Sequence, residues 1–335
     1  MPRRELVLCR GFRGVHSFTA RKLRQLREAD SFAPARSLVV APTAAAAHLL
    51  RGELEDAVFV RSGPGSAALL PTTATPATFL PLLIEEASPE LRIADPLLRE
   101  ALLESAFSKV QEAGIAPPFH LRGGLARRVL ELTDEILAKA PFERSTSGLD
   151  RFVARALDEL EAPDDEGALK LAAQTRFLQV SVAEYRARLE EMGLADAASA
   201  RLALSGRKLP FEQVFVLGGE TLALADLDLL STAPLDLTIA MSGDEDPFPE
   251  GLRSRFSVLK AKGDPDSAPR LLTPHAENEM VFLSRDREEA FTDVARLLKT
   301  LSDDGRLPPL HRIGVVVPRP LTYLYLAKKV FTEAG

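Results

Sequence analysis

A short glycine-containing segment near the N-terminus has the outline of a nucleotide-binding loop. The apolar stretch 6–9 predicts a strand, Gly11 and Gly14 follow in a predicted loop, and a helix-forming stretch comes next. A phosphate-binding loop at such a junction has the pattern G-x-x-x-x-G-K-[ST], because its lysine contacts the phosphates and its hydroxyl binds magnesium. Counted from Gly14, the lysine position holds Val15 and the hydroxyl position holds His16.

Neither side chain can replace the group that the pattern requires. Val15 has no amine for a phosphate, and His16 offers nitrogen to an ion that prefers oxygen ligands. Ser17 could supply a hydroxyl only if the register shifted. The alternative interpretation is that Gly11 and Gly14 only permit a tight turn. A working phosphate loop is therefore not expected here.

The second half of an ATP site would lie at the end of a later predicted strand. A magnesium-binding carboxylate is expected directly after residues 214–217, but Gly218 and Gly219 stand there and Glu220 follows one step later. A single acidic residue in such a turn is usually only solvated. Since both halves lack their key groups, we expect no catalytic residue, no bound cofactor and no enzymatic activity in this part of the protein.

Other chemistries find less support in the composition. The 335 residues include five histidines, which are far apart in the sequence, and one cysteine, Cys9. A single cysteine excludes internal disulfides and cysteine-built metal sites, and the histidine spacing predicts no metal site. No apolar run reaches the ~18 residues of a membrane span, and the N-terminus lacks a secretion signal. We expect a cytoplasmic protein that makes no contact with membranes.

Two locally basic segments are the candidates for nucleic-acid contact, although the net charge of the whole chain is −6. The first segment, 10–27, includes Arg13, and the second, 122–128, includes Arg122, Arg127 and Arg128. Solvated helix faces are the alternative interpretation of both. Channels for single strands also use aromatic stacking, yet the chain has no tryptophan and three tyrosines.

The residues up to about 95 alternate between predicted strands and helices. The predicted strands are 6–9, 37–41 and 57–60, and the predicted helices are 17–28, 42–55 and 76–86. Uninterrupted apolar strands separated by helices favour a parallel sheet covered on both faces. We therefore expect residues 1–95 to form the first part of an α/β domain.

The pattern becomes helical from residue 96 to about 205 and then alternates again. Helical periodicity covers 96–113, 119–140, 148–161 and 167–192. Strands at 212–219 and 235–241, a helix at 223–231 and a linker at 243–274 follow. We expect a helical subdomain at 96–205, inserted into one domain made of residues 1–95 and 206–274.

A last α/β segment is predicted at 275–335. Its elements are strands at 280–284 and 313–317 and helices at 287–301 and 321–333. Two strands cannot complete a sheet. We interpret this segment as the truncated beginning of a second domain, and the chain as part of a longer protein.

The order of these segments resembles a superfamily 1 helicase motor of the UvrD/RecB type, which has two RecA-like domains, the first interrupted by a helical subdomain. More narrowly, it is similar to the helicase-like N-terminal region of the bacterial AddB-like ATP-dependent helicase–nucleases. The segments that carry the resemblance are LVLCRGFRGVHSFTARKL, SLVVAPTAAAAHLLRGEL, FEQVFVLGGETLALADLDLLSTA, FLSRDREEAFTDVARLLKTL and HRIGVVVPRPLTYLYLAKKVFTEAG. The family has G-R-A-G-S-G-K-T where the first segment stands, so the resemblance implies a P-loop NTPase (RecA-like) fold with a degenerate motor.

The resemblance also implies a function in DNA repair. It suggests double-strand-break processing, with single-stranded DNA or duplex ends as ligand and a second helicase–nuclease protein as partner. The segment PATF resembles the family's Thr-Phe segment near the DNA path, which implies DNA contact by Thr78 and Phe79. Phe79 as an ordinary core residue is the alternative. For the whole chain, the alternative is a P-loop-like scaffold or adaptor that binds protein partners and no DNA.

Overall fold

The computed structural model describes residues 2–62, 69–139, 166–243, 248–261, 286–307, 309, 313–317 and 320–333. The chain divides into two compact units, Met1–Ala268 and Pro269–Gly335. The first unit contains a parallel sheet and a group of helices, and the second contains a pair of helices. Each unit is described by itself.

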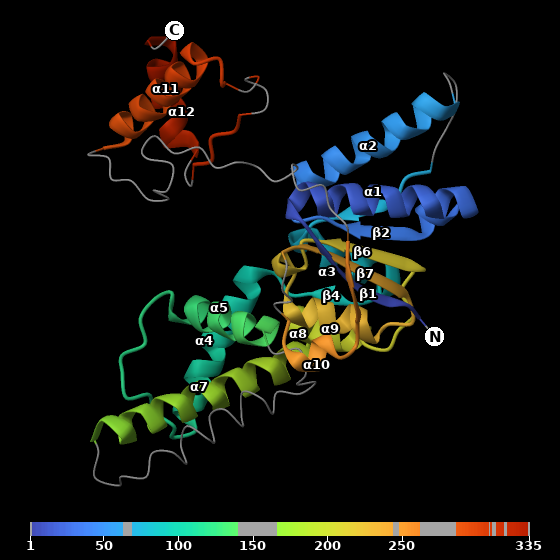
Figure 1. Cartoon of the computed structure of the whole chain (residues 1–335). Coiled ribbons are helices and arrows are strands. Elements are labelled where there is room, and N and C mark those ends of the chain that lie inside the picture. Colours follow the sequence, from blue (N-terminus) through green and yellow to red (C-terminus); the bar gives the residue numbers. More distant parts are fainter. Residues whose placement is uncertain are drawn as a thin grey trace. The chain divides into compact units, whose positions relative to one another are not determined.

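The first unit is built on a six-stranded sheet in which every neighbouring pair is parallel. Its strands are Arg4–Cys9 (β1), Ser37–Val40 (β2), Thr72–Ala74 (β3), Gln213–Leu217 (β6), Asp236–Ser242 (β7) and Ser257–Lys260 (β8). The order across the sheet is β3-β2-β6-β7-β1-β8. The chain thus leaves the sheet after β3 and returns to its middle with β6 (Figure 1).

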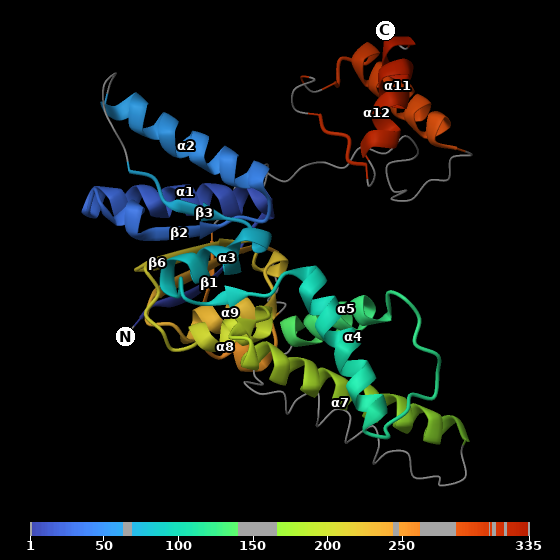
Figure 2. The same ribbon diagram turned by 180° about the vertical axis from the view of Figure 1, so that it is seen from behind.

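Helices cover both faces of this sheet, as the apolar strands predict (Figures 1 and 2). One face carries Gly11–Ala29 (α1) and Ala44–Ser62 (α2), and the other carries Pro76–Ala87 (α3), Ala197–Leu204 (α8) and Leu224–Thr232 (α9). Side chains alternate between the faces, so that Val7 and Cys9 pack with α1 whereas Leu6 and Leu8 pack toward α3, α8 and α9. The α/β class with a doubly covered parallel sheet is confirmed.

Among the described residues, three helices form a group between β3 and β6 in the sequence. These helices are Pro96–Glu112 (α4), Leu125–Lys139 (α5) and Glu166–Glu191 (α7). Arg99 on α4 joins the other two, because its guanidinium donates to both carboxylate oxygens of Asp134 at 2.8 and 2.9 Å and to the Tyr185 hydroxyl at 2.9 Å. Two short parallel strands, Arg92–Ile93 (β4) and Leu194–Ala195 (β5), pair where the chain enters and leaves this group.

Helix α8 lies inside the range expected for the helical subdomain, 96–205, but packs elsewhere. Its Ala200 and Leu204 are buried in the hydrophobic cluster beneath the sheet, together with residues of α3 and α9. The expected helix 148–161 lies outside the described residues.

Several expected elements of the first unit differ from the structure. Residues 57–60 continue α2 instead of forming a strand, and the third strand is the short edge strand β3. The expected linker 243–274 contains a short helix, Glu250–Arg253 (α10), and strand β8. Both edge strands escaped prediction because a short or solvent-exposed strand lacks the buried apolar run that marks the central strands.

The second unit contains Arg287–Asp303 (α11) and Pro320–Glu333 (α12), close to the expected helices. They pack through Phe291, whose ring lies 5.7 Å from that of Tyr323, and through Val330. Residues 313–317, expected as a strand, pair with no other described residue as a strand. The strand expected at 280–284 lies outside the described residues.

Candidate functional site

The junction between β1 and α1 has no loop that could surround a phosphate. Only Arg10 separates the last residue of β1, Cys9, from the first residue of α1, Gly11. Gly11 has a φ of +69°, the left-handed backbone that lets the chain turn directly from strand to helix. The expectation of a loop with a helix from residue 17 is therefore wrong, because Gly14 already lies in the first turns of α1.

The side chains that replace the lysine and the hydroxyl point into the protein. Val15 is completely buried in the hydrophobic cluster between α1 and the sheet. His16 is also buried, and its Nδ1 lies 3.2 Å from Glu53 Oε2 on α2. His16 Nε2 is buried without a hydrogen-bond partner among the described residues. These two side chains hold α1 in place. Of the three candidates Val15, His16 and Ser17, only Ser17 is exposed.

Helix α1 approaches the end of β1 closely. A methyl group added at Gly14 would lie 3.4 Å from Cys9 Cβ, which is an ordinary van der Waals distance. Cys9 itself is buried, and burial raises the pKa of its thiol to about 11, although the nearby Arg21 charge acts in the opposite direction. The contact leaves room for a methyl group at this point.

The two glycines at the end of β6 are favoured by the backbone conformation of the first and by the close packing around the second. Gly218 has a φ of +66°, and its N–H donates to the Ala240 carbonyl at 2.8 Å. A Cβ on Gly219 would lie only 2.6 Å from Ile239 Cγ2 and 3.1 Å from Phe248 Cζ. Glu220 is exposed, so its carboxylate faces solvent at this turn.

The sheet brings these two degenerate positions to the same edge. Cys9 on β1 is paired in register with Ser242 on β7, and Ala240 on β7 is paired with Leu217 on β6. Ligands of open parallel sheets bind at this carboxyl edge. The two segments that were compared with the halves of an ATP site therefore end at the same edge of the sheet, and the first continues into α1 after a single residue.

The residues that the family resemblance assigns to the DNA path have structural functions. Phe79 is completely buried in the core beneath the sheet, so its ring is not available for stacking on a base. Thr78 is exposed, but its hydroxyl accepts the Thr75 N–H at 2.9 Å at the start of α3. This is a helix N-terminal capping interaction. The alternative interpretation of Phe79 as a core residue is correct.

The second basic segment is largely neutralised by its neighbours. Arg127 lies 3.1 Å from Glu100 on α4, and Arg128 lies 2.8 Å from Glu131 on its own helix. Arg122 is exposed and has no acidic partner in the part of the chain that the structure describes. Of the three arginines expected to contact DNA here, two are therefore already paired with carboxylates.

The first basic segment is only partly neutralised: Lys22 Nζ lies 3.8 Å from Glu5 Oε2, but two arginines remain without a carboxylate partner among the described residues. Arg13 and Arg21 are exposed on α1 and have no carboxylate partner among the described residues; Arg21 lies over the Phe18 ring at 5.6 Å. Their spacing, with Ser17 midway, places them on one outward face of the helix. Arg10, also exposed, precedes the first turn. Of these three arginines, only Arg13 was expected from the sequence to contact DNA.

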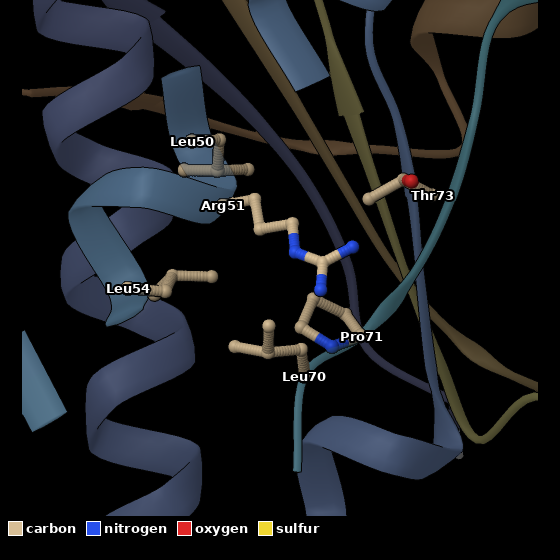
Figure 3. Close-up of a pocket in the computed structure, with 6 residues that line it drawn as sticks. All are labelled: Leu50, Arg51, Leu54, Leu70, Pro71 and Thr73. Atoms are coloured by element: carbon tan, nitrogen blue, oxygen red, sulfur yellow. The ribbon is translucent and has the colours of Figure 1, made fainter. Parts of the chain in front are cut away.

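Two adjoining cavities lie beside α2, away from the carboxyl edge. The larger, of about 110 Å³, is lined by Leu50, Arg51, Leu54, Leu70, Pro71 and Thr73 (Figure 3). The smaller shares Leu54, Leu70 and Pro71 and is also bordered by Arg24 and Arg27 of α1. We call the two cavities together the α1–α2 groove. No feature of the sequence had indicated it, because its walls come from four separate segments.

Two searches of the described residues gave no candidate. They contain no group of three or more His, Cys, Asp or Glu residues placed to hold a metal ion. No helix within them is long and apolar enough to cross a membrane.

Comparison with known proteins adds no assignment. No family model matches the chain, and no curated protein matches it.

Proposed function

We propose that this chain is the N-terminal, helicase-like part of a bacterial DNA-repair helicase–nuclease, in which a motor-like domain without ATPase chemistry serves as a scaffold and guides DNA. The order of its segments supports this proposal, as does a parallel sheet whose chain leaves after β3 and returns at β6 through a group of helices. A partner motor protein would supply ATP hydrolysis during the processing of DNA ends.

The observation that carries the proposal is the construction of α1. The helix begins one residue after β1, where a nucleotide-binding motor needs a loop, and the same helix exposes Arg13 and Arg21 without acidic partners in the described chain. A surface that has lost its nucleotide but keeps uncompensated cations can still bind phosphates of nucleic acid. At 1.5 Å per residue, the two arginines stand ~12 Å apart along the helix, which allows contact with separate phosphates.

The test measures DNA binding as a function of salt. We expect the Arg13→Ala/Arg21→Ala variant to bind a single-stranded oligonucleotide more weakly, with a plot of log K against log salt that is shallower by about 1.4, since each phosphate contact on single strands contributes ~0.7. The matched control is Arg127→Ala/Arg128→Ala, which removes two arginines that are already paired. Its slope should change much less.

A duplex with a single-stranded end gives a second substrate for the same comparison. If the unmodified protein shows no salt-dependent affinity for either DNA, or if both double variants lose it equally, α1 does not guide DNA. The adaptor alternative, in which the chain binds only protein partners, would then be favoured.

A further inference from the structure

The α1–α2 groove has an aliphatic floor. Leu23 on α1 and Leu50 and Leu54 on α2 are almost completely buried beneath it. At its margin, Leu69 keeps 45% of its surface exposed. An apolar cavity of ~150 Å³ takes up a molecule as large as benzene, so the larger cavity has room for one aliphatic side chain.

The charged side chains that line the groove are all arginines. Arg24 and Arg27 border the smaller cavity, and the Arg51 side chain extends toward Pro71 in the larger one (Figure 3). None of the described residues that line either cavity is acidic. The acidic partner of Arg51 is Glu55, one helical turn away, with Nε and Oε1 2.8 Å apart. Arg24 Nε donates to the Ala20 carbonyl at 3.3 Å. Because a backbone carbonyl is neutral, this hydrogen bond does not compensate the positive charge of Arg24.

A ligand of this groove must combine an apolar group with negative charge. Nucleic acid supplies the charge, but its bases bind by stacking on aromatic rings, and the described residues that line the groove include no aromatic side chain. A protein segment with leucine-like side chains between carboxylates matches both the floor and the rim. Charge complementarity of this kind gives an interface its specificity and its association rate.

We propose that the α1–α2 groove docks an acidic, leucine-containing segment of a partner protein, with an aliphatic side chain above Leu50 and Leu54 and carboxylates against Arg24 and Arg27. The proposal goes beyond the DNA-guiding function, because it concerns the α1–α2 groove, which Arg24 and Arg27 border and which Arg13 and Arg21 do not line. It stands even if the chain binds no DNA.

The test uses a synthetic peptide and leucine-methyl NMR of the full chain. The probe is a twelve-residue peptide in which pairs of glutamates alternate with pairs of leucines, compared with one peptide that has glutamine for glutamate and another that has alanine for leucine. We expect the acidic leucine peptide to shift the methyl signals of Leu23, Leu50, Leu54, Leu69 and Leu70. Each control peptide should bind about ten-fold more weakly, because each lacks one of the two complementary features.

Variants of the protein locate the contact. Arg24→Glu/Arg27→Glu should weaken the peptide about ten-fold, whereas Arg13→Glu, a charge reversal ~16 Å from Arg24 along the same helix, should change its affinity less than about two-fold. Leu69→Asp, at an exposed position, is a second variant that should also weaken binding without disturbing the core.

Three outcomes would overturn the proposal. The first is a set of shifted methyl signals that lies outside the groove, and the second is equal binding of the glutamine peptide. The third is displacement of the peptide by a single-stranded oligonucleotide, which would make the groove part of a DNA path. Failure of the DNA-guiding proposal is recognised separately, because it leaves the groove signals and the Arg24→Glu/Arg27→Glu effect unchanged.

Discussion

The β1–α1 and β6–α9 junctions lie on the same edge of the sheet and have each kept a pair of glycines, yet the glycines act differently. Gly11 and Gly218 share a left-handed backbone, with φ values of +69° and +66°. The second glycines differ: Gly14 has an ordinary contact at 3.4 Å, while a Cβ on Gly219 would overlap Ile239 at 2.6 Å. A glycine at such a junction can therefore be required by packing, as Gly219 is, or only be tolerated, as Gly14 is.

The two junctions also differ in what their neighbouring side chains can reach. After β1, Val15 and His16 point into the protein, and the helix begins too early to leave a loop. After β6, Glu220 remains in solvent. The first junction is therefore closed by its own packing, whereas the second is a turn whose acidic side chain is exposed. A phosphate-binding loop at the first junction would thus require a different backbone after β1, beyond any exchange of side chains.

The largest expected effect comes from placing the missing lysine at the first junction. Val15→Lys puts an amine at a position with no exposed surface, among apolar side chains. Burial disfavours the charged form by several pKa units, which corresponds to a loss of about 4 kcal/mol in the free energy of unfolding. Urea denaturation measures this loss, and calorimetry should detect no binding of magnesium-ATP. A variant that is stable and binds ATP would show that this junction can open.

The second prediction contrasts the two packed glycines directly. Gly219→Ala should lower the free energy of unfolding by about 2 kcal/mol, because Ile239 is buried and β-branched and cannot move aside easily. Gly14→Ala, the matched variant, should instead be neutral or stabilise by up to ~1 kcal/mol, since alanine favours a helix interior. Both values follow from urea unfolding curves. Equal effects at the two sites would remove the distinction between them.

The smallest expected effect concerns the buried thiol at the end of β1. The pKa of Cys9 is raised by burial from 9.0 to about 11, so the unfolded chain loses its thiol proton at a lower pH than the folded chain. Stability is therefore retained below pH 9 and decreases as the pH rises from 9 to 11. At pH 10 the loss should be about 1 kcal/mol.

Cys9→Ala serves as the reference for this measurement, because the other groups that titrate between pH 9 and 11 are common to both proteins. The difference between the two stability curves isolates the thiol. Parallel curves would mean that Cys9 reaches solvent. The β1–α1 junction would then be packed less closely than the comparison of the two junctions describes.

The sequence by itself determined the central architecture. Runs of apolar residues such as SLVV in β2 and QVFVL in β6 have no polar alternation, and only a strand buried on both faces accommodates such runs. The helical periodicity between β3 and β6 likewise predicted α4 and α7 within a few residues. The sequence also shows that the residue types an ATP site requires do not stand at the expected positions, because that motif depends on residue types at fixed spacing.

The tertiary structure alone decided which residues are available for function. Phe79 and Thr78 are neighbours, yet one is buried in the core and the other caps α3. Arg127 and Arg13 occupy similar basic segments, but Glu100 lies 3.1 Å from the first, and no carboxylate of the described chain pairs with the second. Glu100 is distant from Arg127 in the sequence, and only the packing of α4 on α5 brings them together. Local sequence carries no information about such long-range neighbours, which fix whether a charge is neutralised or free to bind.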